Sequence, residues 1–89
     1  MDENKNYSTS SLNLATFLCV KEFKLLNIIN GSRRKTFIFE DSDQLKNLIR
    51  VFNFGESSDA ELMVNAREIL QTLRNLKAKL YNSEYHNNQ

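Results

Sequence analysis

Apolar side chains recur along the chain with the spacing of β-strands in one segment and of α-helices in three others. Two apolar runs, residues 23–29 and 36–39, lie on either side of Asn30 and Gly31. Both turn residues tolerate positive φ angles, so this segment predicts a β-hairpin. The pairing predicts two apolar faces, one with Leu26, Ile28, Phe37 and Phe39 and the other with Leu25, Ile29 and Ile38. A competing interpretation is one helix from Leu12 to Ile29, with Gly31 as its cap.

Each helical segment follows a group of short polar side chains. An oxygen of such a side chain accepts a hydrogen bond from a free backbone N–H at the start of the helix. We expect helices from Ser11 to Lys21, from Asp41–Asp43 to Asn53, and from Ser57–Asp59 to Tyr81. The last of them has a long apolar stripe in which residues recur at steps of three and four: Leu62, Ala66, Ile69, Leu73, Leu76 and Leu80.

Together these elements predict an α+β fold in the order helix, β-hairpin, helix, helix, with the last two helices packed on the hairpin. Residues 1–8 and 82–89 are polar and rich in asparagine, so we expect disordered tails around a single domain of residues 9–81. The predicted core consists of Leu14, Leu18, Leu26, Ile28, Phe37, Phe39, Leu45, Leu48, Ile49, Phe52, Leu62, Ile69, Leu73 and Leu76.

The predicted hairpin offers surface to a partner. Two strands alone are marginal in water, and both edges and both apolar faces of this hairpin are open. Pairing of two hairpins across a two-fold axis would make a four-stranded sheet in a homodimer. The apolar stripe of the last helix is a second route to self-association. We therefore expect a small module that acts by binding protein, including a second copy of itself.

The composition restricts the class of protein further. The 89 residues include one cysteine and one histidine, which cannot form an internal disulfide or a Cys/His zinc cluster. A net charge of +1 indicates no partner by itself. The polar N-terminus is not followed by a signal-peptide run, and no apolar run reaches the ~20 residues of a membrane span. We expect a cytoplasmic protein that does not enter a membrane.

Seven basic residues are candidates for contact with nucleic acid or with a protein partner: Arg33, Arg34, Lys35, Lys46, Arg50, Arg67 and Arg74. Arginine and lysine neutralise phosphates and release counterions. The first three lie at or just after the hairpin turn, and the others lie on outer helix faces. Such placement is also typical of residues that only keep a domain soluble. Nucleic-acid binding through Arg33, Arg34 and Lys35 is therefore the alternative function.

No combination of residues in the sequence predicts catalysis. Glu40, Asp41 and Asp43 could hold Mg²⁺, but a helix start also favours short acidic side chains at such positions. Cys19 lies in an apolar helix and His86 lies in a polar tail, so the thiol has no predicted base. We expect a protein that is not an enzyme and that uses no metal, cofactor or small-molecule substrate.

Four short motifs carry a resemblance to a known family: Tyr7-Ser8-Thr9, Leu12-x-Leu14-Ala15-x-Phe17-Leu18, Leu25-Leu26-x-Ile28 and Phe37-Ile38-Phe39-Glu40-Asp41. Over about residues 7–81 the chain resembles a family of short bacterial, archaeal and phage or mobile-element proteins without known function. The family implies a Phe-x-Phe-x-Asp strand followed by helices, the last of them rich in leucine. It usually has glycine where this chain has Glu22. Because a left-handed conformation is costly for Glu22, we expect a different turn after the first helix.

Overall fold

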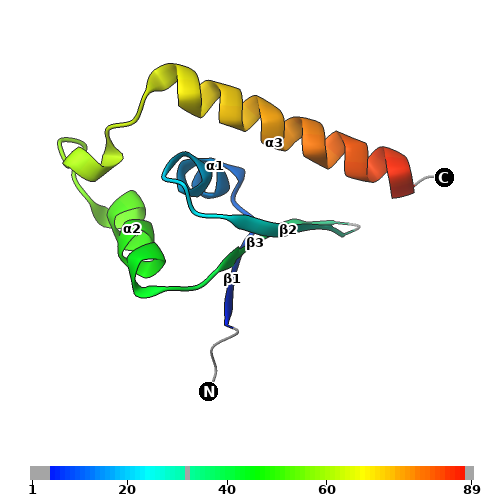
Figure 1. The fold of residues 1–89 in the computed structure, drawn as a ribbon, viewed down its shortest axis with the longest axis horizontal. Helices are drawn as coiled ribbons and strands as arrows, with labels where there is room; N and C mark the ends of the chain where they lie inside the picture. Colours follow the sequence, from blue (N-terminus) through cyan, green and yellow to red (C-terminus); the bar gives the residue numbers. More distant parts are fainter. Residues whose placement is uncertain (1–4, 32, 88–89) are drawn as a thin grey trace.

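The computed structural model describes residues 5–31 and 33–87, with side chains up to residue 81, and the fold belongs to the expected α+β class. The elements follow in the order β1 (Asn6–Thr9), α1 (Leu12–Val20), β2 (Leu25–Asn30), β3 (Lys35–Glu40), α2 (Asp43–Phe54), the 3-10 helix η1 (Ala60–Leu62) and α3 (Ala66–Asn87). Figure 1 shows α1 at the centre, with the sheet on one side, α3 across the other and α2 beside it. The predicted hairpin of β2 and β3 is confirmed, and the alternative of one helix from Leu12 to Ile29 is wrong. The positive φ angles expected at the turn are not found at Asn30 or Gly31, because Asn30 is the last residue of β2 and pairs with Lys35, so the chain turns between these two residues.

The sheet contains one strand more than the predicted hairpin. Its three antiparallel strands lie in the order β1-β3-β2. Tyr7 pairs with Phe39 and Thr9 pairs with Phe37, so β1 covers the edge of β3 that the hairpin leaves open. The free N–H and C=O groups of an edge strand bind a nearby segment through its backbone, whatever the polarity of that segment. The two Phe residues consequently lie in the central strand.

Both predicted tails are shorter than expected. Residues 6–8 form most of β1, and residues 82–87 continue the backbone helix of α3, so regular elements extend into both predicted tails. Residues 1–4 and 88–89 of the two predicted tails lie outside the described residues.

The register of the hairpin differs from the prediction at one end. Ile28 lies opposite Phe37 as expected, but Leu25 lies opposite Phe39, because the register shifts at an irregularity directly after Leu25. One extra residue at a β-bulge changes which side chains point to each face. Leu26 is consequently 44% exposed, and the prediction that it belongs to the core is wrong.

The core forms where α1 meets the sheet, α2 and α3. Its buried apolar side chains are Leu14, Ala15, Phe17, Leu18, Phe37, Phe39, Leu45 and Leu76. Thr16 is also buried, and its hydroxyl donates to the Leu12 carbonyl over 2.7 Å, which satisfies the polar group. Other predicted core residues are half-buried around this cluster: Ile28, Leu48, Ile49, Phe52 and Leu62. The prediction that α2 and α3 pack on the hairpin needs correction, because both pack against α1 and α3 reaches the sheet at β2.

Side-chain caps begin α1 and α2 where the sequence predicts them. The Ser11 hydroxyl accepts a hydrogen bond from the Leu14 N–H over 3.1 Å. The Ser42 hydroxyl accepts one from the Leu45 N–H over the same distance. Both bonds satisfy a donor that has no partner within the helix, so these two starting points are confirmed.

The last helix begins later than predicted. Asp59 caps η1 instead, its carboxylate accepting a hydrogen bond from the Glu61 N–H over 3.0 Å. After an extended stretch, the Asn65 side chain accepts a hydrogen bond from the Glu68 N–H over 3.0 Å, and α3 begins at Ala66. Two short polar caps precede the same apolar stripe, and only the second one begins a long helix. The first cap gives a single 3-10 turn.

The end of α1 places a residue other than glycine in the left-handed region. Glu22 has a φ of 73°, and its N–H donates to the Cys19 carbonyl over 2.9 Å. The Phe23 N–H donates to the Leu18 carbonyl over 3.0 Å, and these two bonds together form a Schellman ending. The expectation of a different turn is wrong, because these bonds and the packing of Phe23 against the core outweigh the strain at Glu22.

Replacing Glu22 by glycine is expected to raise the free energy of unfolding by about 1 kcal/mol, because glycine adopts a positive φ without Cβ strain. The measurement is the urea midpoint, read at an unchanged m-value. Glu22→Ala removes the charge but keeps the Cβ, so its midpoint should stay close to that of the wild type. An equal gain in both variants would assign the effect to the charge and not to the backbone.

Candidate binding surface

An apolar cavity of about 340 Å³ opens between α1, the end of α2, the segment around η1, and α3. We call it the apolar hollow, and it is lined by Asn13, Thr16, Phe17, Phe52, Leu62, Val64, Ile69 and Leu73. The rings of Phe17 and Phe52 lie 5.0 Å apart at an angle of 34° and pack against each other. The predicted core residues Ile69 and Leu73 are only half-buried because they face this hollow.

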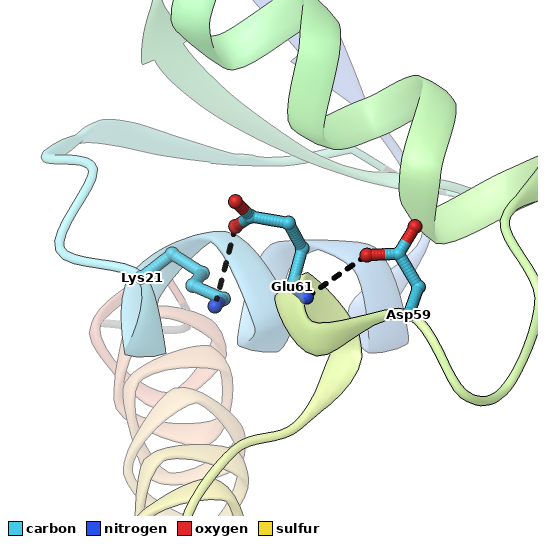
Figure 2. Close-up of polar contacts among 3 residues, drawn as sticks. All are labelled: Lys21, Asp59 and Glu61. Atoms are coloured by element: carbon cyan, nitrogen blue, oxygen red, sulfur yellow. Dashed lines mark hydrogen bonds and ion pairs between the residues drawn. The ribbon is translucent and has the colours of Figure 1, made fainter.

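The η1 wall of the apolar hollow is held by two polar contacts, which Figure 2 shows. One is an ion pair between Lys21 and Glu61, and the other is the hydrogen bond from the Glu61 N–H to the Asp59 carboxylate. The ammonium of Lys21 lies 3.7 Å from a carboxylate oxygen of Glu61 and 5.8 Å from the centre of the Phe17 ring. These contacts join η1 to the end of α1 next to Leu62. The ion pair is partly exposed, so we expect it to position the wall more than to stabilise the fold.

A second cavity, of about 370 Å³, lies where the hairpin meets the C-terminal half of α3. We call it the basic hollow, and it is lined by Leu12, Lys35, Lys77, Leu80 and Tyr81. The Asn30 side chain joins the two elements by donating to the Leu80 carbonyl over 3.5 Å. Arg33 and Arg34 are exposed in the adjacent hairpin loop. This hollow therefore combines an apolar floor with basic groups and the ring of Tyr81, which is 70% exposed.

The two hollows follow each other along the same side of the α1–α3 junction. Leu73 of the first and Lys77 of the second lie one helical turn apart, and Asn13 of the first is the neighbour of Leu12 of the second. From Ile69 to Tyr81, α3 extends about 18 Å at a rise of about 1.5 Å per residue. We call the two hollows together the α1–α3 groove. It is apolar at the η1 end and basic at the hairpin end.

One side of α3 carries exposed side chains, two of which, Lys77 and Tyr81, line the basic hollow. Residues spaced by three and four lie on one side of a helix, and those on this side are Arg67, Leu70, Arg74, Lys77 and Tyr81. All five are exposed, and Leu70 is 60% exposed although it is a large apolar residue. We call this set the α3 stripe. Between Ala66 and Tyr81 the helix has one acidic residue, Glu68, which lies on another side.

The seven predicted basic residues do not form one surface. Arg33, Arg34 and Lys35 lie at the hairpin end of the groove, and Arg67 and Arg74 belong to the α3 stripe. Lys46 and Arg50 are exposed on α2, which lies at the opposite end of the molecule from the hairpin loop (Figure 1). The Lys46 ammonium lies 3.8 Å from a carboxylate oxygen of Asp41.

Three residues of this surface are missing from the sequence prediction: Leu70, Lys77 and Tyr81. They continue the three-and-four spacing of Arg67 and Arg74, and that spacing is visible in the sequence. The spacing alone does not determine how α3 lies across α1 and the hairpin. That arrangement decides that Leu70 is exposed and that Lys77 lies near Lys35.

The acidic residues after β3 fit the interpretation as a helix start. Ser42 is the cap, and Asp43 lies in the first turn of α2. Glu40 and Asp43 are exposed, and one carboxylate oxygen of Asp41 has no hydrogen-bond partner among the described residues. In the part of the chain that the structure describes, no group of three or more His, Cys, Asp or Glu residues could hold a metal ion. His86 belongs to the segment whose side chains are not described.

Burial raises the pKa of the Cys19 thiol above its ordinary value, an effect that the positive charge of Lys79 partly opposes. We expect iodoacetamide at pH 8 to alkylate the folded chain several-fold more slowly than the chain in urea, because the thiolate is the reactive form. For the same reason the folded state should lose stability as the pH rises through the titration range of the thiol, since the unfolded chain releases its proton first. Equal alkylation rates in both states would contradict this.

No helix in the described residues is long and apolar enough to cross a membrane. The fold and the groove define a small α+β domain with a surface that is apolar at one end and basic at the other. The chain belongs to the family described as a domain of unknown function, DUF5659, whose model matches residues 4–82. This match confirms the expected membership in a family without known function. Searches of curated proteins and of solved structures gave no match.

Proposed function

We propose that this chain is a small non-catalytic module that acts by binding another protein through the α1–α3 groove. The observation that carries the proposal is the apolar hollow, together with the exposed side chain of Leu70, which follows the lining residue Ile69 in α3. Apolar surface left in water costs about 25 cal/mol for each Å², and a partner that covers it recovers this free energy. Aromatic and large aliphatic side chains in a concave surface are also typical of the centre of a protein interface.

A photo-reactive amino acid at position 70 tests the proposal in cells. We expect a discrete crosslinked protein from this position and none from the same group at Arg50, which is also exposed but lies on α2. A product with twice the mass of the chain would identify a second copy as the partner. Identical products from both positions, or none from position 70, would contradict protein binding at the groove.

Self-association through the sheet stays a prediction with a changed geometry. The edge of β3 is paired with β1, so the strands at the edges of the sheet are β1 and β2. Pairing across a two-fold axis would then join two three-stranded sheets instead of two hairpins. Light scattering coupled to size-exclusion chromatography measures the molar mass, and the mass shows whether the chain associates with a second copy.

Nucleic-acid binding is the second candidate, because Lys35 lines the basic hollow with Lys77 and Tyr81, and the exposed Arg33 and Arg34 directly precede Lys35 in the chain. Basic groups that hold phosphates and an aromatic ring on which a base stacks are the usual components of a single-strand surface. A mobility-shift titration with DNA and RNA at two salt concentrations tests it. Loss of affinity in the variant with alanine at positions 33 and 34 would support this candidate, and no shift at micromolar protein would remove it.

The proposed setting is the cytoplasm of bacteria or archaea, or of cells that carry their phages or mobile elements. The family resemblance and the single cysteine support it. Inhibition of a host enzyme by such a chain would be one form of protein binding.

A further inference from the structure

We propose that the α1–α3 groove binds an amphipathic, acidic helical segment of a partner protein, with the acidic end of that segment at the hairpin loop. This inference rests on the proposed function and specifies the chemistry and the direction of the partner. The groove is about 18 Å long, which is the length of about three turns of a helix. Its floor is apolar, and a helix with apolar residues at i, i+3, i+4 and i+7 presents a matching face.

The exposed charges of the α3 stripe and of the hairpin loop are all positive. Arg67, Arg74 and Lys77 are exposed along its α3 border, and Arg33 and Arg34 are exposed at its hairpin end. The acidic residues of the η1 wall, Asp59 and Glu61, lie at the other end of the groove; the Glu61 carboxylate is paired with Lys21, and the Asp59 carboxylate accepts a hydrogen bond from the Glu61 N–H. Because charges at an interface are complementary, the partner segment carries carboxylates beside its apolar face and most of them at the hairpin end.

The same charges argue against a second copy of the chain in the groove. Two α3 stripes that face each other bring two sets of positive charge, each made of Arg67, Arg74 and Lys77, onto one interface, and like charges brought together oppose binding. Nucleic acid suits the basic hollow but not the apolar hollow. A phosphate backbone would cover Phe17, Phe52 and Leu73 without an apolar group to place against them.

Fluorescence anisotropy with labelled synthetic peptides of about 14 residues, or four helical turns, tests the inference. The first peptide has a leucine stripe and glutamates concentrated in its C-terminal half, and the second has the same stripe with lysine for every glutamate. The third contains the residues of the first in scrambled order. We expect the first to bind and the other two to bind at least about tenfold more weakly, a difference of ~1.4 kcal/mol. Equal binding of the scrambled peptide would show attraction by charge alone and overturn the inference.

Charge reversal on two helices supplies a matched pair of variants. R74E/K77E reverses two exposed charges in the α3 stripe, and R50E/K46E reverses the same two residue types on α2. We expect the first variant to lose affinity for the acidic peptide and to gain affinity for the basic one, while the second variant binds like the wild type. Equal losses in both variants would overturn the inference, because bulk charge would then explain them.

A spin label at the acidic end of the peptide tests its direction. We expect it to broaden the backbone amide signals of Gly31 and Arg34 and to leave those of Leu62 and Val64 sharp. The reverse pattern would overturn the proposed direction. If a single-stranded oligonucleotide binds more tightly than the acidic peptide and depends on the same two charges, the partner is a nucleic acid and the inference is wrong. Crosslinking at position 70 without binding of the acidic peptide would overturn the inference but leave protein binding intact.

Discussion

Phe39→Ala is expected to lower the free energy of unfolding by about 3–5 kcal/mol, the cost of removing a buried aromatic ring from a close-packed core. Phe39 is fully buried in the central strand, where it lies opposite Tyr7 of β1 and Leu25 of β2. The cavity would therefore lie where both strand pairings meet α1. Because small domains are stable by only about 5–15 kcal/mol, this loss should be visible as a large shift of the urea midpoint.

The matched control for this change is Phe54→Ala. The side chain of Phe54 is 82% exposed at the end of α2, so its removal leaves no cavity. We expect the free energy of unfolding of this variant, read from its urea midpoint, to stay within about 0.5 kcal/mol of the wild-type value. Similar losses in the two variants would mean that Phe39 is not in the core, and the position of β3 at the centre of the sheet would be wrong.

Leu76→Ala is expected to cost about 2–5 kcal/mol of stability, and Leu70→Ala is expected to cost less than about 0.5 kcal/mol. Both residues belong to α3, but Leu76 is 3% exposed in the core and Leu70 is 60% exposed in the α3 stripe. Thermal unfolding followed by circular dichroism measures both losses. Helix propensity is the same in the two changes, so the difference between them reports burial alone.

Partner binding, in contrast to stability, should depend more on Leu70 than on Leu76. Leu70→Ala is expected to weaken capture of the partner, because Leu70 is an exposed apolar residue next to Ile69 in α3, and Ile69 lines the apolar hollow. A Leu70→Ala variant that is as stable as the wild type and also binds the partner equally well would remove this residue from the interface.

Local signals in the sequence were sufficient for most of the individual elements. Asn30 and Gly31 predict the hairpin, and the hydroxyl groups of Ser11 and Ser42 predict the starts of α1 and α2. Each of these signals acts between residues at most a few positions apart. The start of α3 is the exception, because Asp59 and Asn65 are equally good caps and the choice between them depends on how η1 packs.

The candidate surface was predicted only in part. The charge of Arg33, Arg34 and Lys35 is visible in the sequence, but its combination with Lys77 and Tyr81 requires the hairpin end to lie against α3. Lys46 and Arg50 have the same chemistry and lie elsewhere. Residue type therefore predicts which basic residues are candidates for contact with a partner, but only their positions in the fold show which of them lie on the same surface.

Turns, caps and periodicity involve neighbouring residues, so the α+β class, the hairpin and the apolar stripe of the last helix can be predicted from the sequence. The pairing of β1 with β3, the central position of α1 and the adjacency of the two hollows along α3 become visible only in the folded chain. These features depend on contacts between residues far apart in the chain. The free energy of such contacts comes from burial and strand pairing, which no short stretch of residues specifies.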